Sequence, residues 1–532
     1  MFNVLAKSFN TGVAKNARPA HAVGLFHPSL TTMSALAHIP LGQRIPASIH
    51  GVSCSLPTMR AVIGYETKDP GVVLHMHGGY PRFVQHPYLR RAAEHAADAL
   101  GLKDHQIWLT SSLRAAEALR AWLAPAPARV ITHEHLGGVA FPADPDTFAR
   151  AKTFLQHTGT LLSSREAEDY LWRAGLLAGR QEEEVFDGYA PARVKGVVAR
   201  AFGADPAGDV FLTNSGMNAV HAAFSAADAV QRARGRTRWV QLGWLYLDTI
   251  AILQKFTREP ARDYHFQSDV FDLRALERLF AEHGGEIAGV ITEVPTNPLI
   301  QTPDLAAVCA LCRAHGAVFI VDPTIASPLN IDVLPHADLA ANSLTKFAAC
   351  EGDVIAGAVV VNPASPWAET FRREVPGRLE PLYSRDLGRL AEQISGYAPL
   401  IEKINRSTPA VVEFLEKHPR VREVYWSLHP GSRDNYLKLA RAPDAVGGMV
   451  SFTIDGPLDG FYDRVRLPKG ASFGMNNSLI SPFIYLAHYD LVTSESGRET
   501  LRRAGLPADL LRLSVGAEPV DEIIAALAEA LG

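Results

Sequence analysis

Short apolar runs alternate with helix-like segments through the middle of the chain, and this alternation constrains the fold more than any other feature. Apolar runs at 238–243, 287–295 and 317–322 are separated by amphipathic stretches at 273–283 and 304–315. Apolar runs joined by helical connections are typical of a mainly parallel sheet with helices on both faces. We therefore expect an α/β fold that binds its ligands at the carboxyl ends of the strands.

The rest of the chain divides into regions of different character. We predict four regions: an N-terminal arm at 1–60, a second N-terminal region at 61–190, a large sheet domain at 191–385 and a smaller C-terminal α/β domain at 386–532. A long helical connection at 386–417 precedes two strand-like runs of the small domain, at 449–455 and 510–516. A length of 532 residues exceeds what one hydrophobic core usually organises, which supports several domains.

Composition excludes several classes of protein. With 47% hydrophobic and 20% charged residues, the chain has the proportions of a globular protein. A net charge of −4 provides no general field for phosphate backbones, so we expect no nucleic-acid partner. Four cysteines are too few for a disulfide framework and suit a reducing compartment. No run of eighteen apolar residues exists, so we expect no membrane span.

The N-terminal arm has an unusual charge pattern. Up to Tyr65 the chain contains basic residues but no acidic residue. An organelle transit peptide has this composition, and so does a flexible arm. We expect a cytoplasmic protein, with organelle targeting by the arm as the alternative.

Four features of the sheet region match what pyridoxal phosphate needs from a protein. This cofactor needs a lysine amine for its aldehyde, an acid beside its pyridine nitrogen, an anion site for its phosphate and a flat group over its ring. Lys346 follows a short apolar strand and has hydroxyl neighbours, and Asp322 ends another strand. The turn 215–217 opens a helix, whose N-terminus attracts anions, and Tyr246 soon follows a strand.

Each of these four features also has an ordinary structural explanation. A single lysine is usually solvated, an aspartate after a strand often caps a helix or turn, and an aromatic residue usually fills a core. Because all four occur together at strand ends, we predict a pyridoxal phosphate site.

Several segments resemble the cystathionine gamma-synthase family of pyridoxal-phosphate enzymes, in order and with nearly the same spacing. From residue 191 onward they are ITEVPTNPLIQTPDL, AHGAVFIVDPTIASP, NSLTKF, GDVIAGAVV, SFGMNNSLISP and LLRLSVGAE. Upstream, PLGQRIP, HGVSCSLPT, GYETKDP and GGYPRFVQHP resemble the longer fungal members, so the likeness covers almost everything after Leu41. The resemblance implies a fold-type-I transferase in which 61–190 is a family-specific region.

The resemblance also implies roles for single residues. Lys346 and Tyr246 would be catalytic residues. Lys346 would bind the cofactor aldehyde, and Tyr246 would stack on the cofactor ring. Cofactor-binding roles fall on Tyr80, Arg82, Ser215, Gly216, Met217, Tyr246, Asn297, Asp322, Thr324, Ser343, Thr345 and Lys346, and substrate-binding roles fall on Asn297, Ser478 and Arg512. Tyr80 and Arg82 would complete the phosphate site of a neighbouring subunit, which implies a homodimer or homotetramer with shared active sites. No metal is implied.

The activity implied by the resemblance is replacement at the γ-carbon of an O-activated homoserine by cysteine, which forms cystathionine for methionine biosynthesis. The alternatives on the same scaffold are sulfhydrylation by sulfide and elimination from cystathionine or methionine. The sequence does not distinguish among succinyl, acetyl and phosphoryl leaving groups. Departures from the family pattern at Pro323, Phe347 and 243–245 bear on the substrate more than on the cofactor.

Two other chemistries compete with this interpretation. The pairs His75/His77 and His133/His135 could supply ligands for a metal-dependent hydrolase. The run 470–474 matches G-x-S-x-G, but only His488 follows it as a base, which argues against a serine hydrolase. The C-x-x-C pair at 309–312 lies in an apolar helix, so core packing explains it better than redox chemistry. A silent scaffold would need no lysine, aspartate and arginine at strand ends.

Overall fold

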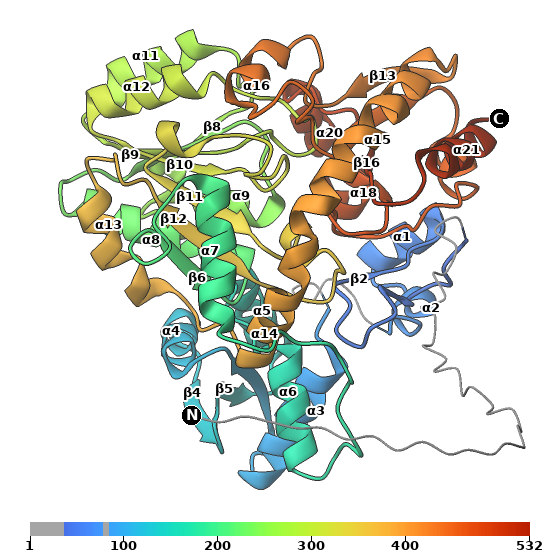
Figure 1. Cartoon of the computed structure of the whole chain (residues 1–532). Helices are drawn as coiled ribbons and strands as arrows, with labels where there is room; N and C mark the ends of the chain where they lie inside the picture. The colour runs from blue at the N-terminus through green and yellow to red at the C-terminus, as the bar shows by residue number, and fades with distance from the viewer. Residues whose placement is uncertain (1–36, 78–83) are drawn as a thin grey trace, which may run out of the picture. The chain divides into compact units, whose positions relative to one another are not determined.

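A seven-stranded sheet forms the centre of the chain in the computed structural model, which describes residues 37–77 and 84–532 (Figure 1). Its strand order is β6-β12-β11-β10-β9-β7-β8. The strands are β6 (Val210–Thr213), β7 (Arg238–Leu242), β8 (Tyr264–Gln267), β9 (Ile287–Glu293), β10 (Val318–Asp322), β11 (Leu339–Ser343) and β12 (Gly357–Val361). All pairs from β11 to β8 are parallel, and β12 runs antiparallel to both of its neighbours, β11 and β6. The expected α/β fold with a mainly parallel sheet is therefore confirmed.

Helices cover both faces of this sheet because neighbouring strand residues point to opposite sides. Phe319 faces a core shared with α7, α11 and α12, whereas Ile320 faces a core shared with α8 and α9. The buried face of α8 is rich in alanine, which lets the helix approach the strands closely. The helices of this part are α7 (Ala190–Phe202), α8 (Gly216–Arg232), α9 (Leu247–Phe256), α10 (Pro260–Asp263), α11 (Leu273–His283), α12 (Leu305–His315), α13 (Ala368–Glu374) and α14 (Ser384–Gln393).

The C-terminal part carries its own four-stranded antiparallel sheet, in the order β13-β14-β16-β15. Its strands are β13 (Val421–Tyr425), β14 (Met449–Ile454), β15 (Leu479–Pro482) and β16 (Leu511–Ser514). Its helices are α15 (Tyr397–Lys417), α16 (Arg433–Leu439), α17 (Leu458–Tyr462), α18 (Phe483–Ala487), α19 (Tyr489–Thr493), α20 (Glu495–Arg503) and α21 (Val520–Leu531). Apolar faces of α15 and α21 pack on this sheet, and α1 (Met59–Glu66) joins the same core.

The segment between residues 84 and 183 contains a second small sheet that the sequence pattern did not predict. Strands β3 (His105–Thr110), β4 (Arg129–His133) and β5 (Leu136–Pro142) pair antiparallel in the order β3-β5-β4. They pack with α3 (Pro87–Ala99), α4 (Leu113–Leu123), α5 (Pro145–Thr158) and α6 (Ser164–Arg173). We call residues 84–183 the N-terminal module (Figure 1, blue to green). The remaining short elements are β1 (Arg44–Ile45), β2 (Ser53–Cys54), α2 (Pro70–Val73) and the 3₁₀ helices η1 (Leu334–His336), η2 (Phe347–Ala349), η3 (Pro376–Arg378) and η4 (Ile394–Gly396).

No helix in the described ranges is long and apolar enough to cross a membrane. The four cysteines, Cys54, Cys309, Cys312 and Cys350, are buried and free. Burial raises the pKa of the Cys309 and Cys312 thiols, which fits core packing rather than redox chemistry.

Candidate active site

One cavity gathers polar side chains from the carboxyl ends of β9, β10 and β11, the N-terminus of α8 and strand β16. Its lining residues include most of the positions predicted from sequence: Ser215, Gly216, Met217, Tyr246, Asn297, Asp322, Thr324, Ser343, Thr345, Lys346 and Arg512. Parallel strands end at the same edge of a sheet, so residues far apart in the sequence meet there.

Lys346 lies in the turn after β11 and is almost fully buried. Its Nζ donates to Ser472 Oγ at 3.0 Å and lies 4.8 Å from the centroid of the Phe473 ring. The hydroxyl of the preceding residue, Thr345, accepts from Ala356 N at 3.1 Å and donates to Ala356 O at 3.2 Å. These bonds fix the turn and hold the amine inside the cavity.

Asp322 is the last residue of β10, and its carboxylate is fixed by Thr324. Its Oδ1 accepts from Thr324 N at 2.9 Å and from Thr324 Oγ1 at 2.5 Å. Thr324 Oγ1 in turn accepts from Ser343 N at 2.9 Å, which joins the ends of β10 and β11. Burial raises the pKa of Asp322, and the bonds from Thr324 and the charge of Lys346 oppose that rise.

Glu293 is a second buried carboxyl group in the cavity, which the sequence interpretation missed. It ends β9 and pairs in register with Asp322 on β10. Its Oε1 accepts from Tyr246 N at 2.6 Å, so it holds the residue at the start of α9. Burial and the charge of Asp322 raise the pKa of Glu293 well above its usual range. The signal was available, since Glu293 is an acid at the end of an apolar run, as Asp322 is.

The turn between β6 and α8 is closely packed against the end of β11. A Cβ on Gly216 would lie 2.5 Å from Ser343 Cβ, so only glycine fits there. Ser215 caps α8 by accepting from Asn218 N at 3.0 Å. The first N–H groups of a helix have no acceptor within the helix and carry partial positive charge. Together with the hydroxyl of Ser343, this turn suits a phosphate group.

Arg512 lies on β16 and reaches the cavity from the C-terminal sheet. Its Nη1 donates to Asn297 Oδ1 at 3.0 Å, and its Nη2 donates to the carbonyl of Ser472 at 3.1 Å. The guanidinium lies 4.5 Å from the centroid of the Phe483 ring. A guanidinium fixed in this way presents a planar fork that suits a carboxylate.

Ser478, predicted to bind substrate, does not line this cavity. It is fully buried, and its Oγ donates to Glu518 Oε2 at 2.8 Å and accepts from Gly516 N at 2.8 Å. Ser472 lies in the cavity instead, between Lys346 and Arg512, with a φ of 94° that is rare for a serine. Strained backbone of this kind often marks a functional site.

Tyr80 and Arg82 lie outside the described residues, so their proposed reach into a neighbouring subunit stays a prediction, as does the oligomeric state.

The described residues lack the geometry that a metal-dependent hydrolase or a serine hydrolase requires. No group of three or more metal-ligating side chains occurs in the described ranges. His133 Nδ1 instead forms a 2.7 Å hydrogen bond with the hydroxyl of Tyr170. His488 Nε2 accepts from Trp244 Nε1 at 3.1 Å, whereas the hydroxyl of Ser472 faces Lys346. Ser472 and His488 are therefore not arranged as nucleophile and base.

The residues of the cavity fit pyridoxal phosphate. Lys346 would hold the aldehyde, Asp322 the ring nitrogen, and the turn 215–217 with Ser343 the phosphate. Tyr246 lines the cavity next to these groups and would lie against the ring. The glycine-only contact between the α8 turn and β11 is a close approach of backbone and side chain of the kind that phosphate-binding turns require.

Comparisons with known proteins agree with this geometry. Residues 201–532 match the family model described as Cys/Met metabolism PLP-dependent enzyme. An L-2-amino-4-chloropent-4-enoate dechlorinase/desaturase from Streptantibioticus cattleyicolor is 42% identical, over 89% of this chain and 94% of its own. A cystathionine gamma-synthase from Neurospora crassa is 27% identical, over 92% of this chain and 98% of its own.

Solved structures show the same fold. The cystathionine gamma-synthase from Xanthomonas oryzae pv. oryzae in complex with cystathionine aligns with a TM-score of 0.54 at 22% identity, over 67% of this chain and 89% of its own. The match to the family model covers more than half of the chain, and the 42% identical relative spans nearly all of it. The expected cofactor is confirmed: the protein belongs to the pyridoxal-phosphate-dependent enzymes of cysteine and methionine metabolism.

Proposed function

We propose that this protein uses pyridoxal phosphate to eliminate a substituent, with a proton, from the side chain of a short apolar L-amino acid substituted at its γ-carbon. The observation that carries the proposal is the lining of the cavity on the side of Arg512. There, Phe473, Phe483, Leu486 and Ala487 form an apolar wall. We call these four residues the substrate wall.

Charge in the cavity supports a substrate with one carboxylate. Among the described lining residues, only Lys346 and Arg512 have cationic side chains. If Arg512 binds the α-carboxylate, the described lining has no further arginine or lysine to pair with a second negative group. A succinyl substituent carries such a group in its carboxylate, and a phosphoryl substituent is itself negatively charged. A buried anion without a partner is strongly disfavoured, whereas a halide or another small substituent fits an apolar wall.

The relatives support the same order of preference. The relative at 42% identity is named for dechlorination and desaturation of L-2-amino-4-chloropent-4-enoate, a short amino acid that carries chlorine at its fourth carbon. Fungal relatives named cystathionine gamma-synthase are less similar, at 27% and 23% identity.

We assign the steps to side chains as follows. The cofactor, when bound, accepts the electron pair that remains when a proton leaves the substrate. Arg512 binds the α-carboxylate through its planar fork, and Asn297 and the carbonyl of Ser472 hold that fork in place. Asp322 holds the proton on the ring nitrogen.

Lys346 moves the protons. Its amine takes the proton from the α-carbon and supplies protons to carbon or to the leaving group later in the cycle. The substituent leaves with the electron pair of its bond, so the net change is loss of HX and no oxidant is needed. Ser472 Oγ, 3.0 Å from Nζ, keeps the amine in the cavity.

A second candidate is replacement of the γ-substituent of an activated homoserine by cysteine or sulfide. The likeness to the cystathionine gamma-synthase of Neurospora crassa over 92% of this chain favours it. Both reactions share the first proton transfers, and they differ in whether a thiol adds at the γ-carbon before product leaves.

One set of assays separates the candidates. The holoenzyme is incubated with L-2-amino-4-chloropent-4-enoate and with O-acetyl-, O-succinyl- and O-phosphohomoserine, each with and without cysteine or sulfide. We expect release of chloride from the chlorinated substrate without any thiol. Formation of cystathionine from an activated homoserine, with no turnover of the chlorinated substrate, would overturn elimination and establish the second candidate.

A further inference from the structure

The turn that ends α5 touches residues 215–217, which we call the phosphate turn. This contact is notable because α5 belongs to the N-terminal module, which lies outside the part of the chain that matches the family model. The carbonyl of Gly159 accepts from Ser215 Oγ at 3.2 Å. The carbonyl of Thr158 accepts from Asn218 Nδ2 at 3.1 Å. These two bonds orient the first and the fourth residue of the turn that begins α8.

Gly159 makes this contact possible through its conformation and its size. It ends α5 in the left-handed region, with a φ of 68°. A Cβ at this position would lie 2.4 Å from Ser215 Oγ and 2.4 Å from Asn218 N. Because Asn218 N is a backbone atom of α8, the clash could be relieved only by moving the end of α5 and the phosphate turn apart.

Helix α5 also contacts the wall of the cofactor cavity that includes Tyr246. Asp248 lies two residues after Tyr246, in the first turn of α9, and is fully buried. Gln156 Nε2 donates to Asp248 Oδ1 at 2.8 Å, and His157 Nδ1 lies 3.1 Å from the same oxygen. Lys255 Nζ lies 2.9 Å from His157 Nε2, so a lysine that donates there makes His157 donate to Asp248.

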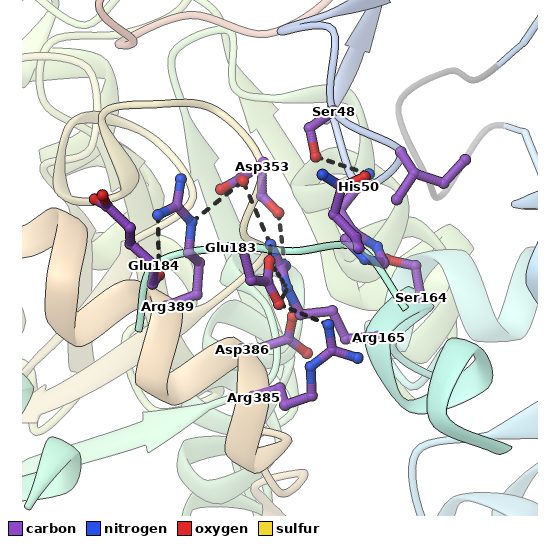
Figure 2. A network of polar contacts seen from close by, with 12 residues as sticks. Ser48, His50, Ser164, Arg165, Glu183, Glu184, Asp353, Arg385, Asp386 and Arg389 are labelled. Carbon is purple, nitrogen blue, oxygen red and sulfur yellow. Dashed lines mark hydrogen bonds and ion pairs between the residues drawn. The ribbon is translucent and has the colours of Figure 1, made fainter. Parts of the chain in front are cut away.

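A buried charge network anchors the module that carries α5 (Figure 2). Arg165 of α6 is 1% exposed and contacts three carboxylates. Its Nη2 donates to Glu183 at 2.7 Å, and its Nη1 donates to Asp386 of α14 at 2.9 Å and to the carbonyl of Asp353 at 2.8 Å. Arg385 donates to Glu183 at 2.7 Å from the same helix as Asp386. Such multiply paired charges fix the position of the two helices relative to each other.

We propose that the C-terminal turn of α5, residues 156–159, is a positioning element for the cofactor. Through Thr158 and Gly159 it sets the phosphate turn, and through Gln156 and His157 it sets the start of α9 that carries Tyr246. The N-terminal module thereby contributes to cofactor binding within its own chain. This role depends on the cofactor alone and is independent of which substrate is turned over.

The test compares two glycines with the same backbone conformation. Gly203 ends α7 with a φ of 69°, and a Cβ added there would meet no atom of the described chain within 4 Å. Gly203→Ala therefore introduces the same strain without the clash. The full-length variants are titrated with pyridoxal phosphate and with pyridoxal, and dissociation constants are read from absorbance. We expect Gly159→Ala to weaken pyridoxal phosphate about tenfold or more, the scale of a lost bond to an anion, and pyridoxal much less.

A second pair of variants tests the Tyr246 side. His157→Ala removes the contact with Asp248, and His265→Ala removes a half-buried histidine on the edge strand β8, which contacts Arg238 Nη1 instead. We expect His157→Ala to weaken pyridoxal phosphate and pyridoxal alike, and His265→Ala to leave both unchanged.

Three outcomes would overturn the proposal. The first is that Gly159→Ala binds pyridoxal phosphate as tightly as Gly203→Ala. The second is that it loses both ligands equally. If Gly159→Ala does not fold, the proposal fails when His157→Ala binds both ligands as tightly as His265→Ala. Failure of the proposed elimination reaction would change none of these binding constants.

Discussion

The two ends of the cavity are built on different principles. At the cofactor end, Asp322, Ser215 and Lys346 lie at strand or helix ends of the large sheet, and each is held by a hydrogen bond to a neighbour. At the substrate end, β16 supplies Arg512, whereas α18 and the loop before β15 supply the substrate wall, whose side chains pack in apolar clusters. Fixed charges suit a group that never changes, whereas packed side chains select by shape.

We therefore expect substitutions at the two ends to have different effects. A substitution at the cofactor end should lower turnover of every substrate by the same factor. A substitution at the substrate end should change the ratio of kcat/KM between two substrates, or the pH range over which this end of the cavity is stable.

The largest effect is expected at Lys346. Lys346→Ala removes both the covalent attachment of the cofactor and the base that moves the proton at the α-carbon, so turnover of every substrate should fall about a thousandfold or more. The visible absorption band of the bound cofactor should shift as well. Lys469 is the control, because it is also buried but donates to the carbonyl of Pro57 at 2.8 Å outside the cavity. Retained turnover in Lys346→Ala would remove this lysine from the mechanism.

The second effect is expected at Asp322, whose carboxylate keeps a proton on the ring nitrogen. Asp322→Asn keeps the shape and loses the charge, so kcat should fall about 10²–10³-fold, the scale of a lost preorganised charge. Asp338→Asn is the matched control, since Asp338 is also buried but accepts from Phe319 N at 2.8 Å within the sheet. Unequal losses between two substrates would contradict the placement of Asp322 at the cofactor end.

The cofactor end could be predicted from sequence because its residues mark strand ends. Asp322 follows an apolar run, and Lys346 follows another, so the pattern that predicts the strands also locates the charges. Glu293 gives the same signal, because it also ends an apolar run.

The remainder could not be predicted, for physical reasons. An apolar wall has no motif, since core residues have the same composition, and Phe483 is indistinguishable from a core phenylalanine in sequence. Ser472 and Ser478 lie six residues apart in one loop, and only the backbone path decides which faces Lys346. The contact of Gly159 with the phosphate turn joins residues 56 apart in the sequence. Gly159 ends a helix of the N-terminal module, whose strands carry no functional motif.

The third prediction concerns the stability of the substrate end. Burial lowers the pKa of His488 to about 4, and its neutral Nε2 accepts from Trp244. Because the unfolded chain binds the proton near pH 6.5, stability is present above that pH and is lost as pH falls toward 4. His488 should contribute a loss of about 2 kcal/mol between pH 7 and pH 5.

His488→Gln keeps an acceptor for the Trp244 N–H but cannot titrate. Urea unfolding at pH 7 and pH 5 should therefore show a smaller fall in stability in this variant than in the wild type. His86 and His221 also have pKa values lowered to about 4, and they titrate in both proteins. An equal fall in both proteins would show that His488 is already charged in the folded state.

The smallest effect is expected at Phe483, whose ring packs on Arg512 and faces the cavity. Phe483→Ala opens the substrate wall, so the ratio of kcat/KM for O-succinylhomoserine to that for L-2-amino-4-chloropent-4-enoate should rise about tenfold, the discrimination typical of a change in pocket size. Phe483→Leu keeps an apolar side chain and should move the ratio less. Because Arg512 binds both α-carboxylates, any loss of its packing lowers both kcat/KM values and cancels in the ratio. An unchanged ratio with equal losses would place Phe483 with the groups that act on all substrates, and the contrast between the two ends would not hold there.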